Sequence, residues 1–192
     1  DRALFSTPAN PGENIRYRGE EIHRDDLLLK SGTPLTPAAI GLLASVGMHQ
    51  VAVVSLPKVA IIPTGSELVS PGGKLSGSQI YESNSYALAA AVAQMGLLAQ
   101  VFPPVRDDPP LLREILGQAL TTFSHVLVTG GVSVGDFDHG RGIFSELGVT
   151  EIFWQVAQKP GKPLYFGRHG KTSVFGLPGN PVSAMVTFEL FV

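Results

Sequence analysis

From Lys58 onward the sequence alternates between segments typical of β-strands and segments typical of amphipathic α-helices. The strand-like segments are short and rich in apolar residues, and the helix-like segments carry apolar residues three or four positions apart. The predicted strands are Val59–Ile62, Ala99–Phe102, Val126–Thr129, 151–156, 163–167 and 172–177, and the predicted helices are Ser85–Met95, one capped by Asp108, Gly142–Leu147 and one from Pro181 onward. This alternation predicts an α/β fold, a three-layer and mostly parallel sheet with helices on both faces.

The composition provides enough apolar material for a buried core and narrows the choice of partners. Of the 192 residues, 44% are hydrophobic and 16% are charged, which excludes a disordered chain and suits one α/β domain with a smaller piece. The formal net charge of −2, without a basic block, argues against a nucleic-acid partner. The absence of Cys excludes thiolate metal sites and favours a cytoplasmic location. No apolar stretch is strong enough to cross a membrane, and no segment resembles a signal peptide.

Residues 1–57 differ from the rest of the chain. They begin with loop-forming residues, continue through a charged stretch at 13–26, and reach a helix pattern between Pro37 and Val46 that Gly47 would end. An alternating strand pattern follows at Val51–Val54. We therefore predict a domain boundary between residues 57 and 58. Because the chain starts at Asp1 without Met and stops inside a helix-like run, we expect it to be part of a longer protein.

Four loops with unusual residues each follow a predicted strand. They are Pro63–Glu67, Arg106–Asp108, Gly130–Asp138 and Pro178–Ser183. In a parallel sheet these loops meet at the carboxyl edge, which is where open α/β sheets bind ligands. The sequence therefore predicts one site built from four distant segments.

Two of these loops have features of anion-binding sites. Gly130, Gly131 and Gly135 would let several backbone N–H groups approach one oxyanion, although a simple turn explains the same glycines. The spacing excludes the dinucleotide fingerprint, and Asp136 stands where a P-loop needs Lys. Asn180 and Pro181 would start a helix, whose N-terminus either binds an anion or is merely capped.

The charged residues suggest a metal ion and a cationic contact. Asp107, Asp138 and Glu67 provide the oxygen ligands that Mg²⁺ prefers, whereas Asp108 is better explained as a helix cap. Lys159 and Lys162 lie on a proline-containing turn before a strand, and solvated surface lysines are the simpler alternative. The five histidines lack metal-ligand spacing.

Taken together, the motifs resemble the molybdopterin molybdenumtransferase family, which includes bacterial MoeA and the E domain of gephyrin. The resemblance is carried by Thr64–Leu68, Gln79–Asn84, Arg106–Asp108, Thr129–Asp138, Lys159–Pro163 and Leu177–Ser183, and extends weakly to Gly12–Arg16 and Leu35–Gly47. It implies that residues 58–192 are a molybdopterin-binding domain and that residues 1–57 are part of a neighbouring elongated domain.

The resemblance also implies an activity. Family members take adenylylated molybdopterin and molybdate, release AMP and place molybdenum on the dithiolene sulfurs, with a divalent cation such as Mg²⁺. They are homodimers, and the adenylyltransferase that acts before them is a possible partner. The alternatives are a dimeric protein-binding scaffold of the gephyrin type and a nucleotide pyrophosphatase that uses the same sheet edge. The carboxylates together with the two lysines favour the enzyme over a scaffold.

By motif position, the resemblance assigns catalytic roles to Asp107, Asp138, Glu67, Lys159 and Glu21, with Asp138 and Glu67 as metal ligands. The implied substrate-binding residues are Thr64, Gly65, Ser66, Gly130, Gly131, Ser133, Gly135, Lys162, Pro178, Gly179, Asn180, Pro181 and Ser183. Two positions depart from the family pattern. Gln155 stands where a basic residue is usual, and Glu21 stands where an aspartate is expected.

Overall fold

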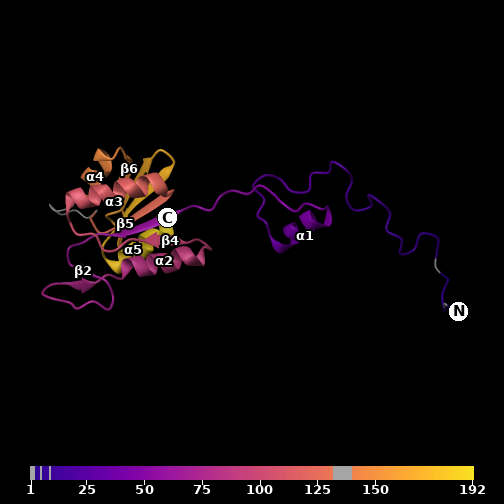
Figure 1. The fold of residues 1–192 in the computed structure, drawn as a ribbon, viewed down its shortest axis with the longest axis horizontal. Coiled ribbons are helices and arrows are strands. Elements are labelled where there is room, and N and C mark those ends of the chain that lie inside the picture. The colour runs from indigo at the N-terminus through magenta and orange to yellow at the C-terminus, as the bar shows by residue number, and fades with distance from the viewer. Residues whose placement is uncertain (1–2, 5, 9, 132–139) are drawn as a thin grey trace. The chain divides into compact units, whose positions relative to one another are not determined.

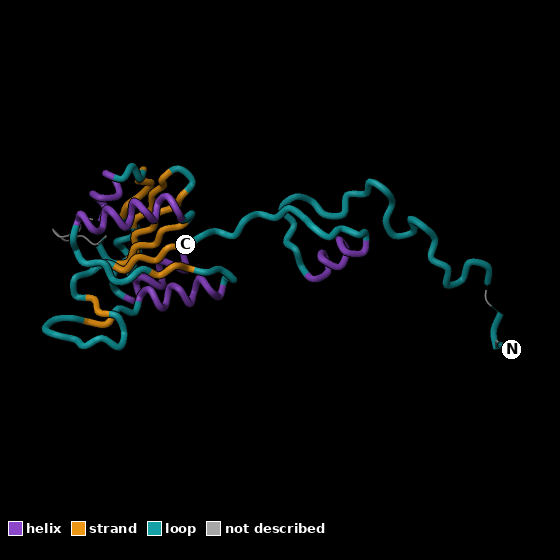
Figure 2. The backbone as a smooth tube through the Cα atoms, viewed as in Figure 1, coloured by secondary structure: helices purple, strands orange, loops and turns teal. Residues whose placement is uncertain are grey.

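The computed structural model describes residues 3–4, 6–8, 10–131 and 140–192. The chain divides into two compact units, Asp1–Val54 and Ser55–Val192, and each is described here by itself. Figures 1 and 2 show the elements of both units. Within the described ranges, no helix combines the length and the hydrophobicity that a membrane crossing requires.

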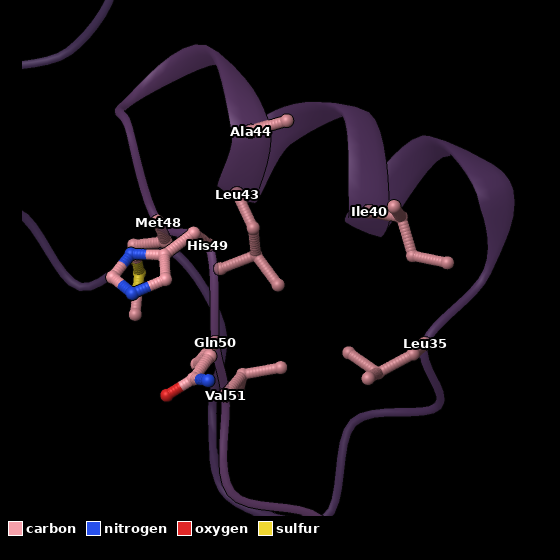
Figure 3. Close-up of a pocket in the computed structure, with 8 residues that line it drawn as sticks. All are labelled: Leu35, Ile40, Leu43, Ala44, Met48, His49, Gln50 and Val51. Atoms are coloured by element: carbon pink, nitrogen blue, oxygen red, sulfur yellow. The ribbon is translucent and has the colours of Figure 1, made fainter.

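The first unit contains one described helix, α1 (Pro37–Ser45). The Thr36 side chain caps it by accepting from the Ala39 N–H at 3.2 Å, and Pro37 occupies the first turn. Gly47, with φ +82°, ends it as predicted, and its N–H donates to the Ala44 carbonyl at 3.0 Å. Leu35, Ile40, Leu43 and Met48 line a hollow of about 140 Å³ beside the helix (Figure 3).

The predicted strand at Val51–Val54 is wrong. These residues form no ladder with another segment, and Val53 and Val54 are 66% and 90% exposed. Alternation of apolar residues indicates a strand only where a neighbouring strand satisfies the backbone N–H and C=O groups.

The second unit is built on a six-stranded sheet in the order β4-β1-β5-β8-β7-β6. The strands are β1 (Val59–Pro63), β4 (Ala99–Val101), β5 (His125–Thr129), β6 (Thr150–Trp154), β7 (Tyr165–His169) and β8 (Thr172–Leu177). Strands β4, β1, β5 and β8 pair in parallel. Strand β7 pairs antiparallel with β8, and β6 pairs antiparallel with β7. A separate parallel pair, β2 (Leu68–Val69) and β3 (Ile80–Tyr81), lies between β1 and the next helix in sequence.

Helices cover both faces of the sheet, which confirms the predicted α/β fold (Figure 1). Helices α2 (Asn84–Gln94) and α5 (Pro181–Phe191) pack on the face that carries Val59 and Ile61. Helices α3 (Pro109–Thr122) and α4 (Gly140–Glu146) pack on the face that carries Ala60 and Ile62. Consecutive residues of a strand point to opposite faces of the sheet. Because helices cover both faces, all five residues of β1 are buried.

The two antiparallel strands begin and end at other residues than predicted. Strand β6 ends at Trp154, and Gln155 follows with φ +69°, a left-handed conformation that interrupts the extended chain. The Gln155 N–H still donates to the Leu164 carbonyl at 2.8 Å, and β7 begins at Tyr165. The predicted strands at 151–156 and 163–167 are therefore present in shifted form.

Candidate functional site at the carboxyl edge of the sheet

The loops that follow β1 and β4 are tied to each other at the carboxyl edge. The Ser66 N–H donates to Oδ2 of Asp107, and the Asp107 N–H donates to Oγ of Ser66, each at 3.0 Å. The Gly65 N–H donates to the Val105 carbonyl at 3.0 Å. These bonds join residues 40 or 41 positions apart in sequence. Among the described residues, none donates a hydrogen bond to the second oxygen of the exposed Asp107 carboxylate.

The loop that follows β5 lies directly against the loop that follows β1. The Thr64 N–H donates to the Thr129 carbonyl at 2.8 Å. A Cβ atom on Gly130 would lie 2.3 Å from the Thr64 carbonyl oxygen, and one on Gly131 would lie 2.7 Å from Thr64 Oγ1. Both glycines have positive φ. Glycine is therefore required here for the approach of the two loops. The Gly130 N–H donates to the Leu177 carbonyl at 3.2 Å, so this group is not available for the predicted oxyanion.

The loop that follows β8 completes the same edge. The Asn180 side chain accepts from the Ser183 N–H at 3.2 Å, and Pro181 begins α5, so the predicted cap is confirmed. A Cβ atom on Gly179 would lie 3.7 Å from the Cα atom of Gly130. Pro178 is buried, whereas Gly179, Asn180 and Pro181 are exposed. The start of α5 thus lies beside the glycines that follow β5.

The turn Lys159–Lys162, called the lysine turn below, packs against the first turns of α5. A Cβ atom on Gly161 would lie 2.6 Å from Thr187 Cγ2 and 3.8 Å from the Ser183 carbonyl oxygen. Lys159 and Lys162 flank this glycine and are exposed. Two cations therefore lie on a turn that is fixed to the helix whose N-terminus faces the same edge.

The acidic residues that were predicted for the site and that the structure describes lie in two places. The Glu67 carboxylate is exposed and lies over Gly65, within 2.9 Å of where a Cβ atom would be. Glu67 and Asp107 are thus both close to Ser66. Glu21 lies in the first unit, where it pairs with Arg16 at 3.4 Å. Among the residues that the structure describes, no group of three or more His, Asp or Glu could hold a metal ion.

Several predicted residues lie outside the described ranges. They are Ser133, Gly135 and Asp138. The predicted set of three carboxylates depends on Asp138, so it stays a prediction. The oxygen chemistry of Glu67 and Asp107 suits Mg²⁺.

Sequence reasoning assigned no role to Asn84, which the structure places inside the edge. Its Nδ2 donates to the Gly179 carbonyl at 2.8 Å and lies 3.4 Å from Thr129 Oγ1. The residue is 8% exposed. The only signal in the sequence was its place in the motif Gln79–Asn84, because burial of a polar residue at a helix start cannot be deduced from local spacing.

Two hollows among the described residues lie elsewhere. One is the hollow beside α1, and the other lies near the opposite end of the parallel strands, where Val59, Val92 and His125 are among the lining residues. Neither contains a predicted site residue. In the part of the chain that the structure describes, the candidate site is therefore defined by hydrogen bonds and close backbone contacts.

Comparison with known proteins shows the family of the chain. Residues 60–192 match the model of a family described as a probable molybdopterin binding domain. The chain belongs to the molybdopterin-binding domain family. Residues 1–47 match the model of the MoeA N-terminal region, domains I and II. The molybdopterin-binding match contains all four loops of the edge, whereas Glu21 falls in the N-terminal match.

Similar proteins carry related names. The chain is 38% identical over 199 residues to molybdopterin molybdenumtransferase 2 of Mycobacterium tuberculosis, covering 100% of this chain and 49% of the relative. It is 37% identical to the molybdopterin molybdenumtransferase of Haemophilus influenzae, covering 98% of this chain and 46% of the relative. The chain thus spans about half the length of the curated relatives it matches.

A solved structure with the same fold covers nearly the whole chain. The crystal structure of a molybdopterin biosynthesis MoeA protein from Pyrococcus horikoshii superposes with a TM-score of 0.77 at 34% identity, covering 99% of this chain and 48% of that one. The similarity extends over both the molybdopterin-binding domain and the N-terminal match.

Proposed function

We propose that this chain acts in molybdenum cofactor biosynthesis, as part of a molybdopterin molybdenumtransferase that inserts molybdenum from molybdate into adenylylated molybdopterin with release of AMP. The main structural support is that the loops after β1, β4, β5 and β8 contact one another at one sheet edge, through hydrogen bonds and close backbone approaches. The names of the curated relatives support the reaction. They do not favour a protein-binding scaffold or a nucleotide pyrophosphatase.

The edge offers separate places for the anionic parts of the substrates. In this proposal, the backbone N–H of Gly131, together with Ser133 and Gly135, holds the phosphates of the adenylylated molybdopterin. Gly130 contributes by its close approach to Thr64, because its own N–H donates to the Leu177 carbonyl at 3.2 Å. Thr64, Gly65 and Ser66 line the same edge. Fixed donors of this kind stabilise the charge that develops on a leaving phosphate without costly reorganisation.

Molybdate is a dianion, so its binding site should carry positive charge. We assign it to Lys159 and Lys162 together with the start of α5, where the helix dipole favours negative charge. Pro178, Gly179, Asn180, Pro181 and Ser183 form that helix start. Molybdate must lose oxygen atoms as sulfur binds, and the carboxyl groups of Glu67 and Asp107 would transfer the protons that this requires.

Mg²⁺ is the proposed cation, with Glu67 and Asp138 as its ligands. When bound it would neutralise charge on the phosphoanhydride. The exposed carboxylate of Glu67 suits that role.

The decisive experiment measures release of AMP from adenylylated molybdopterin as molybdate is added, with this chain and with any longer protein that contains it. We expect Asp138→Asn and Asp107→Asn to abolish molybdate-dependent release while binding of adenylylated molybdopterin persists. Asp108→Asn is the matched control, because it removes a neighbouring carboxylate but preserves a good helix cap. Unchanged release in Asp138→Asn would refute the assigned role, and faster hydrolysis of dinucleotides would favour a pyrophosphatase.

We further propose a cytoplasmic homodimer that receives its substrate from the preceding molybdopterin adenylyltransferase. The resemblance to the family supports both partners, and it also gives Glu21 of the N-terminal region its proposed catalytic role. Light scattering coupled to size-exclusion chromatography measures the mass directly. A mass equal to one chain would contradict the dimer.

A further inference from the structure

Asn84 contains the only buried side-chain N or O atom without a hydrogen-bond partner among the described residues. Its Nδ2 has a hydrogen-bond partner, because it donates to the Gly179 carbonyl at 2.8 Å. Its Oδ1 is buried and accepts from no described donor. A buried acceptor without a partner is unfavourable and calls for an explanation.

The orientation of the Asn84 amide follows from its neighbour. The Gly179 carbonyl can only accept, so the NH₂ end of the side chain must face it, and exchanging N and O would place two acceptors together. The unpaired atom is therefore an acceptor. Its missing partner must be an N–H or O–H donor.

Asn84 is not needed to cap its own helix. The Glu82 carboxylate already accepts from the Ser85 N–H at 2.7 Å at the start of α2. Asn84 instead connects the end of β5 to the loop after β8, within the edge that forms the candidate site. The unpaired acceptor is thus located among the residues to which substrate binding is assigned.

We propose that Asn84 is a substrate-binding residue whose Oδ1 accepts a hydrogen bond from an N–H or O–H group of the bound substrate. This inference rests on the proposed function. The pterin carries ring N–H and amino donors, and the adenylate carries an amino group and ribose hydroxyls. A fully ionised phosphate or molybdate oxygen has no proton to donate and would be repelled by Oδ1. Asn84 therefore favours the part of the substrate that carries N–H or O–H donors, and it disfavours an anion at the same position.

The test measures binding of two probes separately, molybdopterin and AMP, by calorimetry. The variant Asn84→Leu keeps the approximate size and removes the acceptor. We expect at least a tenfold loss of affinity for one of the probes. A loss for molybdopterin assigns the donor to the pterin, and a loss for AMP assigns it to the adenylate.

Thr172→Val is the matched control. Thr172 is also buried, and its hydroxyl donates to the Phe123 carbonyl at 2.9 Å, at the opposite end of β8 from Gly179. This variant loses a buried hydrogen bond but should keep the affinity of the wild type for both probes. Thermal unfolding of the two variants measures how much each change destabilises the fold.

Wild-type affinity for both probes in a folded Asn84→Leu variant would overturn the inference and leave the proposed function intact. If Asn84→Leu does not fold, Asn84→Ala also removes the acceptor, and the same loss is expected. A wild-type chain that binds neither probe would instead overturn the proposed function.

Discussion

Gly130 is restricted to glycine by two independent constraints. Its φ of +80° lies in the left-handed region, and a Cβ atom would lie 2.3 Å from the Thr64 carbonyl oxygen. Gly96 has a similar φ of +75° but no neighbour within 4 Å of a Cβ atom. A comparison of Gly96 with Gly130 therefore separates the effect of the left-handed backbone from the effect of the close contact with Thr64.

We expect Gly96→Ala to lower the free energy of unfolding by about 1–2 kcal/mol, since alanine must adopt a left-handed conformation. Gly130→Ala should lower it by about 3 kcal/mol or more, because the backbone of β1 must also move. Urea denaturation measures both. Equal losses would mean that the approach of the two loops adjusts without strain.

His125 makes stability depend on pH at the residue scale. Burial, and to a lesser extent the positive charge of Arg168, lowers the pKa of His125 from its usual 6.5. Below pH 6.5 the unfolded chain therefore binds a proton that the folded protein resists, so stability is complete above this pH and falls as the pH decreases. The loss continues until the folded protein is also protonated.

We expect His125→Gln to reduce this loss. The measurement is the urea midpoint of wild type and variant between pH 7.5 and pH 5, values chosen to span the titration of histidine. Parallel pH profiles would show that His125 does not contribute.

At the scale of elements, the helix starts of the second unit differ in what surrounds them. Asp108 caps α3 through the Leu111 N–H at 3.2 Å, and Asn180 caps α5 through the Ser183 N–H at the same distance. Only α5 also has the lysine turn packed against its first turns. Capping alone therefore stabilises both helices, and the cationic turn distinguishes α5.

We expect Asn180→Ala and Asp108→Ala each to lower the free energy of unfolding by about 1 kcal/mol, the usual effect of losing a cap. Only Asn180→Ala should also weaken molybdate binding, because the helix start would lose its fixed conformation. Denaturation and calorimetry with molybdate measure the two effects. Equal weakening of molybdate binding by both variants would contradict the assignment to α5.

At the scale of the whole molecule, the division into two units has a direct consequence. Residues 51–56 between them are exposed, and the sheet with its covering helices is contained in Ser55–Val192. A segment that lacks buried contacts is a preferred site of proteolysis.

Limited proteolysis should therefore cut near residues 48–58 and release a fragment that retains the second unit. We expect this fragment to keep its helical circular dichroism and to unfold cooperatively. Its loss as an intact species during digestion would contradict the predicted domain boundary.

The sequence by itself determined the features that depend on residues a few positions apart. The caps at Asp108 and Asn180, the end of α1 at Gly47 and the alternation of strands with helices all follow from local spacing, which acts in the unfolded chain as well as in the fold. The parallel arrangement then predicted that four loops would meet at one edge.

Only the tertiary structure decided which segments pair and which polar groups are buried. Val51–Val54 has the alternation of a strand but no partner, β6 and β7 join the sheet antiparallel, and Ser66 meets Asp107 across 41 residues of sequence. The burial of Asn84 against Gly179 is likewise a contact between distant segments. Such contacts depend on the packing of the whole unit, because hydrogen-bond partners far apart in sequence leave no local pattern.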